Sequence, residues 1–245
     1  MKHFDEERRK ELDALYGQYA RGGRFAAYRA RLRKWRKQSL WRATVWSTLA
    51  LKRVLDILGA AAGLTVLSPV LLGTAFGIWF EDRGPIFFRQ ERVGKRGTLF
   101  GMYKFRSMVT DADRVLEEIR EKNEAGDVLF KMKDDPRITK IGRVIRKFSI
   151  DELPQFINVL WGDMSLVGPR PALPSEVEQY AQKERVRLIV KPGITCLWQI
   201  GGRSNLDFQQ QVELDRTYIE SQSFWGDIKI LLKTVPAVLT GKGAY

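Results

Sequence analysis

Cysteine and histidine are almost absent from this chain of 245 residues. Cys196 is the only cysteine and His3 is the only histidine. A single cysteine excludes a disulfide framework and favours a reducing compartment, so we expect Cys196 to be a small buried apolar residue. The lone histidine lies in a charged terminus, which excludes histidine-based metal or acid–base chemistry. Any catalysis must therefore use carboxylates, lysine, arginine or tyrosine.

Net charge is nearly absent beyond the first quarter of the chain. Residues 54–245 contain 27 Lys and Arg against 24 Asp and Glu, whereas residues 1–53 contain 15 against 5. Such a basic arm is typical of a nucleic-acid tail, of a segment on anionic lipid or of a solvated helix. Tryptophans at positions 35, 41 and 46 favour the lipid–water boundary. We predict a helical arm on the membrane surface over residues 1–50, with the solvated helix as the alternative.

Long apolar runs are also scarce, and residues 54–80 form the most extended one. Asp56 is its only charged residue. A straight helix of this length would reach about 40 Å, enough to cross a hydrocarbon core of about 30 Å. Ser68-Pro69 lies in the middle, however, and proline bends or breaks a helix. Each half is too short to cross alone, so the segment is either a kinked spanning helix or a re-entrant hairpin.

The residues before the apolar run favour the hairpin. Lys52-Arg53 should keep that end in the cytoplasm, and a full crossing would then export the domain that follows. We therefore predict a re-entrant membrane helix over residues 51–82, broken at Ser68-Pro69, and a cytoplasmic catalytic domain over residues 83–245. Asp56 should pair with Lys52 or Arg53, because an unpaired carboxylate in an apolar segment is costly.

The remaining chain predicts an α-rich α+β fold with a small β element. Residues 87–108 are predicted to form short strands, because the turn signals Gly84-Pro85 and Gly94-Lys95-Arg96-Gly97 flank and divide them. Residues 138–148 have apolar side chains at helical spacing and a basic flank, as in an interfacial amphipathic helix or an ordinary surface helix. Three further helices are expected over residues 111–125, 154–160 and 225–239, the last of them amphipathic and containing Pro236.

Two adjacent carboxylates, Asp151 and Glu152, are the strongest chemical signal. An arbitrary acidic dipeptide is usually a solvated turn, but here basic residues surround it in sequence. Arg170 lies between Pro169 and Pro171, which stiffen the backbone that aims it. One guanidinium group can donate hydrogen bonds to two phosphate oxygens at once, and two neighbouring carboxylates can bind a divalent metal ion. Other candidate phosphate ligands are Lys104, Arg106, Arg143, Arg146, Lys147 and Arg203, the last in a glycine-rich loop.

Four motifs in register give the chain a specific resemblance over about residues 51–245. They are Tyr103-Lys104-Phe105-Arg106-Ser107-Met108, Asp151-Glu152-Leu153-Pro154-Gln155, Gly162-Asp163-Met164-Ser165-Leu166-Val167-Gly168-Pro169-Arg170-Pro171 and Lys191-Pro192-Gly193-Ile194-Thr195. Together they resemble the bacterial monotopic phosphoglycosyl transferases, which initiate capsule, exopolysaccharide and O-antigen assembly. Lys52-Arg53 and the Ser68-Pro69 break also fit that family. Residues 1–50 are not explained by it, since larger members carry spanning helices and a further domain there.

The resemblance implies an enzyme that transfers a sugar-1-phosphate, such as a hexose-1-phosphate, from a UDP-sugar to undecaprenyl or another polyprenyl phosphate and releases UMP. It implies that Asp151 is the nucleophile of a covalent phosphosugar–aspartyl intermediate, that Glu152 assists in metal binding or proton handling, and that Mg²⁺ is the cofactor. It implies that Arg146 and Arg170 bind phosphate. Lys104, Arg203 and Asp215 belong to the family's motifs, but the resemblance assigns them no specific role.

The implied location is the cytoplasmic face of the bacterial inner membrane. The expected partners are the UDP-sugar, the polyprenyl phosphate and an anionic membrane, without nucleic acid. The oligomeric state stays open, and a homodimer is compatible with the sequence. A different class of protein, a non-catalytic basic binder of membrane or nucleic acid, would use residues 1–53 as its working part and would bind with a steep salt dependence. The acid pair and the small net charge after residue 53 count against it.

Overall fold

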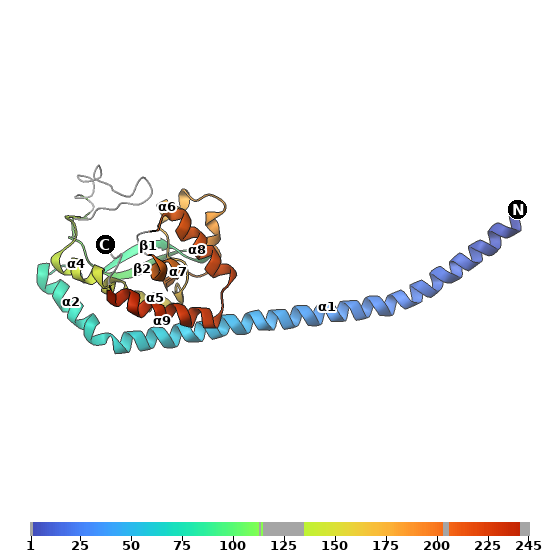
Figure 1. Cartoon of the computed structure of the whole chain (residues 1–245), viewed down its shortest axis with the longest axis horizontal. Coiled ribbons are helices and arrows are strands. Elements are labelled where there is room, and N and C mark those ends of the chain that lie inside the picture. The colour runs from blue at the N-terminus through green and yellow to red at the C-terminus, as the bar shows by residue number, and fades with distance from the viewer. Residues whose placement is uncertain (1, 113, 115–134, 203–205, 241–245) are drawn as a thin grey trace. The chain divides into compact units, whose positions relative to one another are not determined.

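The computed structural model describes residues 2–112, 114, 135–202 and 206–240 (Figure 1). The chain divides into two units, Met1–Ala50 and Leu51–Tyr245. Helix α1 (Lys2–Val66) supplies all described residues of the first unit and the start of the second. In the first unit, the side chains of Trp35, Trp41 and Trp46 are exposed. The arm is therefore helical, and its association with a membrane surface stays a prediction.

The apolar segment is broken where the sequence predicts a break. Helix α1 ends at Val66, and helix α2 (Ser68–Asp82) begins with Pro69 in its first turn. The two helices bend by 61° at this point. Among the described residues, no single helix has the length and apolar character needed to cross a bilayer, whereas the bent pair together has both. The break is confirmed, and the membrane hairpin remains a prediction.

Polar side chains of α1 tie its last turns to the body of the second unit, and here one prediction was wrong. Asp56 does not pair with Lys52 or Arg53. Its Oδ1 accepts hydrogen bonds from Ser165 Oγ and from Leu166 N, both at 2.9 Å. These donors come from a segment about 110 residues later, and a search among sequence neighbours cannot find them.

The two basic neighbours of Asp56 also have distant partners. Lys52 Nζ lies 2.7 Å from Asp227 Oδ2 and donates to the Val167 carbonyl at 3.0 Å. Arg53 donates to the carbonyls of Val159 and Leu160 at 2.6 and 2.8 Å. Burial removes water from these polar groups, and the hydrogen bonds to their protein partners offset the free-energy cost of that loss.

Two small sheets follow. Strand β1 (Phe87–Val93) pairs with β2 (Leu99–Phe105) as an antiparallel hairpin, in the predicted region, with Phe87 opposite Phe105 and the turn η1 (Lys95–Gly97) at its end. The sequence did not predict the second sheet, in which β3 (Ser165–Val167) runs parallel to β4 (Gly193–Thr195). A Cβ atom on Gly193 would lie 2.1 Å from the backbone nitrogen of Gly168, so this approach requires glycine.

Helices surround the two sheets. The predicted helices over residues 138–148, 154–160 and 225–239 correspond to α4 (Lys140–Lys147), α5 (Gln155–Trp161) and α9 (Phe224–Thr240), which contains Pro236. Most of the polar helix predicted over residues 111–125 lies outside the described residues. Elements that the sequence analysis did not predict are η3 (Ile150–Glu152), α6 (Pro174–Glu178), η4 (Glu184–Ile189), α7 (Leu197–Gly201) and α8 (Phe208–Glu220).

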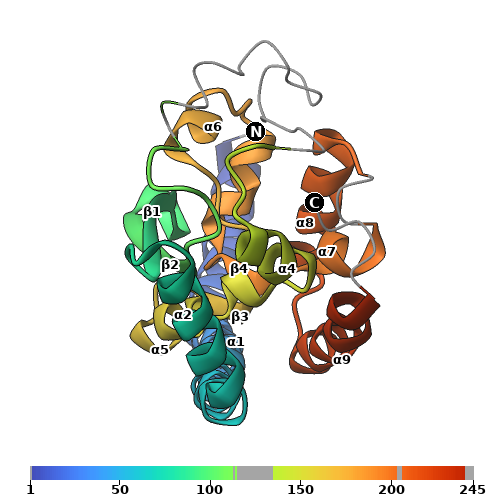
Figure 2. The same cartoon turned by 90° about the vertical axis from the view of Figure 1, so that its left-hand side faces the viewer.

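Two apolar clusters form the core of the second unit. The larger one joins α1, α5, the two sheets and α8–α9 through residues that include Ala60, Met102, Val159, Leu166 and Tyr218. The smaller one joins α2, β2 and α4 through Ile78, Phe105 and Ile145. Figure 2 shows α2 and α4 side by side, with α9 on the far side of α4 from α2. The result is a helix-rich domain with a small β component, as predicted.

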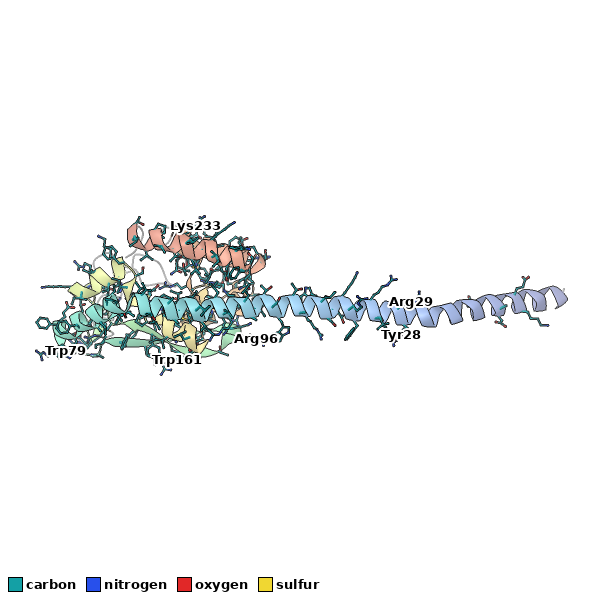
Figure 3. The ribbon with its side chains drawn as sticks, turned by 90° about the horizontal axis from the view of Figure 1, so that it is seen from below. Tyr28, Arg29, Trp79, Arg96, Trp161 and Lys233 are labelled. Atoms are coloured by element: carbon teal, nitrogen blue, oxygen red, sulfur yellow. The ribbon has the colours of Figure 1, made fainter. Side chains whose placement is uncertain are left out.

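Apolar side chains are also exposed on several helices of this unit. They lie on α2 (Leu72, Phe76, Trp79, Phe80), on α4 (Val144), on α5 (Trp161) and on α9 (Trp225, Leu232, Val235, Leu239). Figure 3 shows Trp161 pointing away from the body of the unit and Trp79 at the outer end of α2. Exposed apolar surface of this extent is typical of an interaction site.

Candidate active site

A tight turn between α4 and α5 presents the acid pair. Helix α4 ends at Lys147, and Ser149 adopts the left-handed conformation, with φ 54° and ψ 25°. A residue other than glycine pays a conformational cost there, and such residues concentrate at functional sites. The 3₁₀ turn η3 then carries Asp151 and Glu152, and Leu153 and the buried Pro154 lead from it into α5. The backbone therefore fixes the direction of both carboxylates.

Glu152 lies between two cations. Its Oε1 is 2.9 Å from Lys104 Nζ and 3.2 Å from Arg170 Nη1. Burial alone would raise the pKa of Glu152, but the positive charges of Lys104 and Arg170 and their hydrogen bonds outweigh it and hold the pKa well below its usual value. Glu152 is therefore ionised across the physiological pH range, and it fixes the positions of Lys104 and Arg170.

Asp151 has the opposite environment. Its side chain is buried, and no described residue donates a hydrogen bond to its carboxylate. Burial, with the adjacent charge of Glu152, raises the pKa of Asp151 against the lowering effect of Lys104, Arg146 and Arg170. A desolvated carboxylate with lone pairs not engaged by donors is well suited to attack an electrophile or to bind a cation.

The backbone around Arg170 is held from both sides. The Pro169 carbonyl accepts a hydrogen bond from Gly193 N at 2.8 Å, and the Pro171 carbonyl accepts one from Arg92 Nη1 at 2.9 Å. The Arg170 side chain is 37% exposed, so its guanidinium can reach a ligand while it pairs with Glu152. The predicted stiffness of this segment therefore comes from its neighbours as well as from the prolines.

Arg92 is a residue that the sequence analysis missed. It is buried at the end of β1, where its Nε and Nη2 donate to Gln90 Oε1 and its Nη1 donates to the Pro171 carbonyl. Burial and the nearby charge of Arg170 lower its pKa to about 10. An available signal was the spacing of Gln90 and Arg92, which places both on one face of a strand.

Gln155 is a second residue that was missed. A cavity of about 10 Å³ lies beside the acid pair, lined by Glu152, Gln155, Arg170 and neighbours, with room for about one water molecule. Gln155 is only 3% exposed, and no described residue forms a hydrogen bond with its side chain. Its position three residues after Glu152, where a helix would place it on the same face, was the available signal.

The other predicted site residues lie in different surroundings. Arg146 is close enough to Asp151 to influence its pKa. Arg106 pairs instead with Asp82 at the end of α2. Asp215 is buried on α8, with Oδ2 2.7 Å from Arg187 Nε. Arg203 lies outside the described residues. The structure thus brings Lys104, Arg146 and Arg170 together with the acid pair, and it gives Arg106 and Asp215 partners of their own.

The donor set can be compared with what Mg²⁺ requires. Within the described ranges, no three His, Cys, Asp or Glu residues lie close enough to hold a metal ion together. Mg²⁺ is, however, commonly bound by one or two carboxylates with water and substrate phosphates completing the shell. Asp151 has lone pairs to offer, whereas Glu152 is already engaged by two cations. The residues therefore fit a Mg²⁺ ion that a substrate diphosphate helps to hold, with Asp151 as the main protein ligand.

Comparison with known proteins places this site in a family. Residues 47–241 match the bacterial sugar transferase family, and the chain belongs to it. It is 52% identical over 200 residues to the galactosyl transferase CpsE of Streptococcus agalactiae, covering 81% of this chain and 44% of that protein. It is 44% identical over 206 residues to the undecaprenyl-phosphate galactose phosphotransferase of Salmonella typhimurium, covering 81% and 42%.

A shorter relative is covered almost completely. The exopolysaccharide production protein ExoY of Sinorhizobium fredii is 41% identical over 198 residues, which are 79% of this chain and 88% of that protein. The chain spans less than half of the length of the CpsE and Salmonella proteins. The resemblance to the bacterial phosphoglycosyl transferases that the four motifs indicated is thereby confirmed.

Proposed function

We propose that this protein transfers a hexose-1-phosphate from a UDP-sugar to undecaprenyl phosphate or another polyprenyl phosphate and releases UMP. The Salmonella relative, which is named for undecaprenyl phosphate, supports the acceptor, and two relatives named for galactose support a hexose. The observation that carries the proposal is the buried Asp151 carboxylate, which has no hydrogen-bond donor among the described residues and faces Lys104, Arg146 and Arg170. This arrangement would place a nucleophile among groups that bind phosphate.

In the first step, a carboxylate oxygen of Asp151 attacks the β-phosphorus of the UDP-sugar. A bond forms between that oxygen and phosphorus, and the bond from phosphorus to the oxygen shared with the α-phosphate breaks, so UMP leaves. Lys104 and Arg170, which Glu152 holds in place, would bind the phosphoryl oxygens and the charge that develops on them. The product is an acyl phosphate, in which the Asp151 carboxyl group and the sugar-1-phosphate share an anhydride oxygen.

In the second step, an oxygen of the acceptor phosphate attacks the same phosphorus. The Asp151 carboxylate leaves with its electron pair, and a polyprenyl diphosphate sugar forms. Mg²⁺, when bound, would supply charge neutralisation for the diphosphate. The small cavity beside Gln155 would hold a water molecule or a single oxygen atom of the substrate next to Arg170.

For the membrane, we propose that the α1–α2 break forms a re-entrant hairpin and that α4 and α9 lie at the interface, with the active site on the cytoplasmic side. The exposed apolar side chains on α2, α4 and α9 support this arrangement. Tags placed before Lys52 and after Asp82 should report the same side of the membrane. Opposite sides would replace the hairpin with a spanning helix.

The decisive test of the function is Asp151→Asn in the full-length chain. The variant should fold and should lose UMP release from a UDP-sugar, both with and without polyprenyl phosphate, by at least about 10⁴-fold, as loss of a catalytic nucleophile does. Asp111→Asn, at an exposed carboxylate on the surface, is the matched control and should keep full activity. Screening the wild-type protein against a panel of UDP-sugars, with UMP as the readout, identifies the donor. Full activity of Asp151→Asn would remove Asp151 as the nucleophile.

A further inference from the structure

A groove lies between helices α2 and α4, and the catalytic steps above do not use it. Its volume is about 550 Å³, within the range of about 300–1,000 Å³ that is typical of ligand pockets. Val70, Gly73 and Gly77 lie on the α2 side, and Ile141 and Val144 lie on the α4 side. Both cartoon views show the two helices as neighbours (Figures 1 and 2). The lining is almost entirely apolar, with Lys140 as its charged member.

The groove is narrow at the Gly77 end and wider toward Val70. Lys140 N donates to Glu81 Oε1 at 2.9 Å, which joins the start of α4 to the end of α2. A Cβ atom on Gly77 would lie 3.2 Å from Ile141 Cδ1, so the helices touch there. At Gly73, one turn earlier, a Cβ atom would meet nothing within 4 Å. The helices therefore diverge from Gly77 toward Val70, and the groove widens in that direction.

The groove borders the turn that carries the acid pair. Ile150 lines the groove, and the next residue in the same 3₁₀ turn is Asp151. Arg146, on the last turn of α4, acts electrostatically on Asp151. A ligand in the groove would thus have apolar surroundings along its length and positive charge where it meets the acid pair. That charge pattern matches a hydrocarbon chain with an anionic head.

We propose that this groove binds the isoprenoid chain of the acceptor, with the units next to the phosphate between α2 and α4 and the phosphate at Asp151. The inference rests on the proposed function, since that function supplies an acceptor with a long apolar chain and one phosphate. Such a chain must approach the nucleophile from an apolar side, and the groove provides that approach. The gap at Gly73 leaves room for a branch methyl group of the isoprenoid.

Filling the gap tests the inference. Gly73→Phe in the full-length protein, assayed in membranes, adds a ring at a groove position where a Cβ atom meets nothing within 4 Å. We expect kcat/KM for polyprenyl phosphate to fall by about tenfold or more, because the ring displaces buried apolar surface of the ligand. UMP release in the absence of acceptor should stay within about twofold of wild type, because the donor side is untouched.

Leu72→Phe is the matched control. Leu72 is 71% exposed and precedes Gly73 on α2, so it points away from the groove. This variant should change neither half-reaction. Unchanged kcat/KM for the acceptor in Gly73→Phe would overturn the inference and would mean that the groove holds bilayer acyl chains only. A wild-type protein that releases no UMP from any UDP-sugar would instead reject the proposed function, so the two failures are distinct.

A second measurement decides the matter if Gly73→Phe loses both half-reactions through misfolding. Wild-type protein is irradiated with a polyprenyl phosphate that carries a diazirine on an isoprene unit near the phosphate. Crosslinks should map to peptides of α2 and α4. Crosslinks on α9, or equal labelling of all exposed apolar helices, would overturn the inference.

Discussion

Two places in the second unit bury charge, and they do so in opposite ways. At the start of this unit, Lys52 and Asp227 form an ion pair, and the Asp227 carboxylate also accepts a hydrogen bond from Tyr218. At the acid pair, Glu152 is matched by two cations, but Asp151 has no donor among the described residues. Removing one partner of a matched buried pair destabilises a fold, whereas a buried carboxylate without a donor and with a raised pKa is a candidate for chemistry. We call the Lys52–Asp227 pair the structural pair, because its charges hold the fold, and the Asp151 carboxylate the chemical charge, because it is available to react.

The largest expected effect breaks the structural pair. Lys52→Met leaves the Asp227 carboxylate buried beside Tyr218 without its cation, so the free energy of unfolding should fall by about 3–5 kcal/mol. Urea unfolding in detergent micelles measures this change. Lys233→Met, on the exposed side of α9 (Figure 3), is the control and should alter stability by less than about 0.5 kcal/mol. Equal stability of the two variants would show that the pair contributes little.

The next effect concerns the chemical charge and its pH dependence. Burial, with the charge of Glu152, raises the pKa of Asp151 to about 6 against the opposing cations, and only the ionised carboxylate attacks phosphorus. The rate of UMP release without acceptor should therefore be constant above pH 7 and should fall about tenfold per pH unit well below pH 6. Glu152, with its lowered pKa, stays ionised over this range. A flat profile down to pH 4.5 would contradict the raised pKa.

A smaller effect compares the stability of Asp151→Asn with that of wild type. The raised pKa means that Asp151 contributes stability below its unfolded pKa, and this contribution is lost as the pH rises through about 6. At pH 7.5 the neutral Asn should therefore stabilise the protein, by on the order of 1 kcal/mol. The gain should disappear near pH 4, where both side chains are neutral. Lower stability of the variant at pH 7.5 would mean that the carboxylate is structurally matched after all.

The smallest effect concerns the basic arm. A chain that lacks residues 1–40 keeps Lys52, the acid pair and all their described partners, so its turnover number should stay within about twofold of the full-length protein. UMP release in detergent, where membrane binding plays no part, measures this. Loss of all activity would favour the alternative in which residues 1–53 are the working part of the protein.

Local signals predicted the parts of the fold that depend on local physics. Helical spacing located α4, turn residues located the strands of the β1–β2 hairpin, and Pro69 located the break between α1 and α2. The parallel β3–β4 pair escaped because three-residue strands have no readable period and depend on the contact of Gly168 with Gly193. Helix α8 was missed although Asp207 and Gln210 form a capping box that the sequence displays.

The site shows the same division. The acid pair, Lys104 and Arg170 were readable because they lie in recognisable motifs, and the structure brings them together. Arg92 and Gln155 were not readable as site residues, because their importance comes from burial that only tertiary packing creates. The partners of Asp56 were predicted wrongly for the same reason. A sequence motif identifies which residues belong to the site. Contacts between residues far apart in the chain determine which charged side chains form pairs, and the sequence does not show them.

The partners of Lys52 have a consequence for how the protein is made. They follow it in the chain by 115, 166 and 175 residues. While the ribosome is still synthesising the segments between them, the ammonium group has none of these partners and must remain hydrated. Arg53 and Asp56 can meet their partners once residues 159–166 have emerged, but Lys52 can meet Asp227 only after α9 has begun to emerge. Translation that stops before residue 227 therefore yields a product in which Lys52 lacks its carboxylate partner, and we expect quality-control proteases to recognise it.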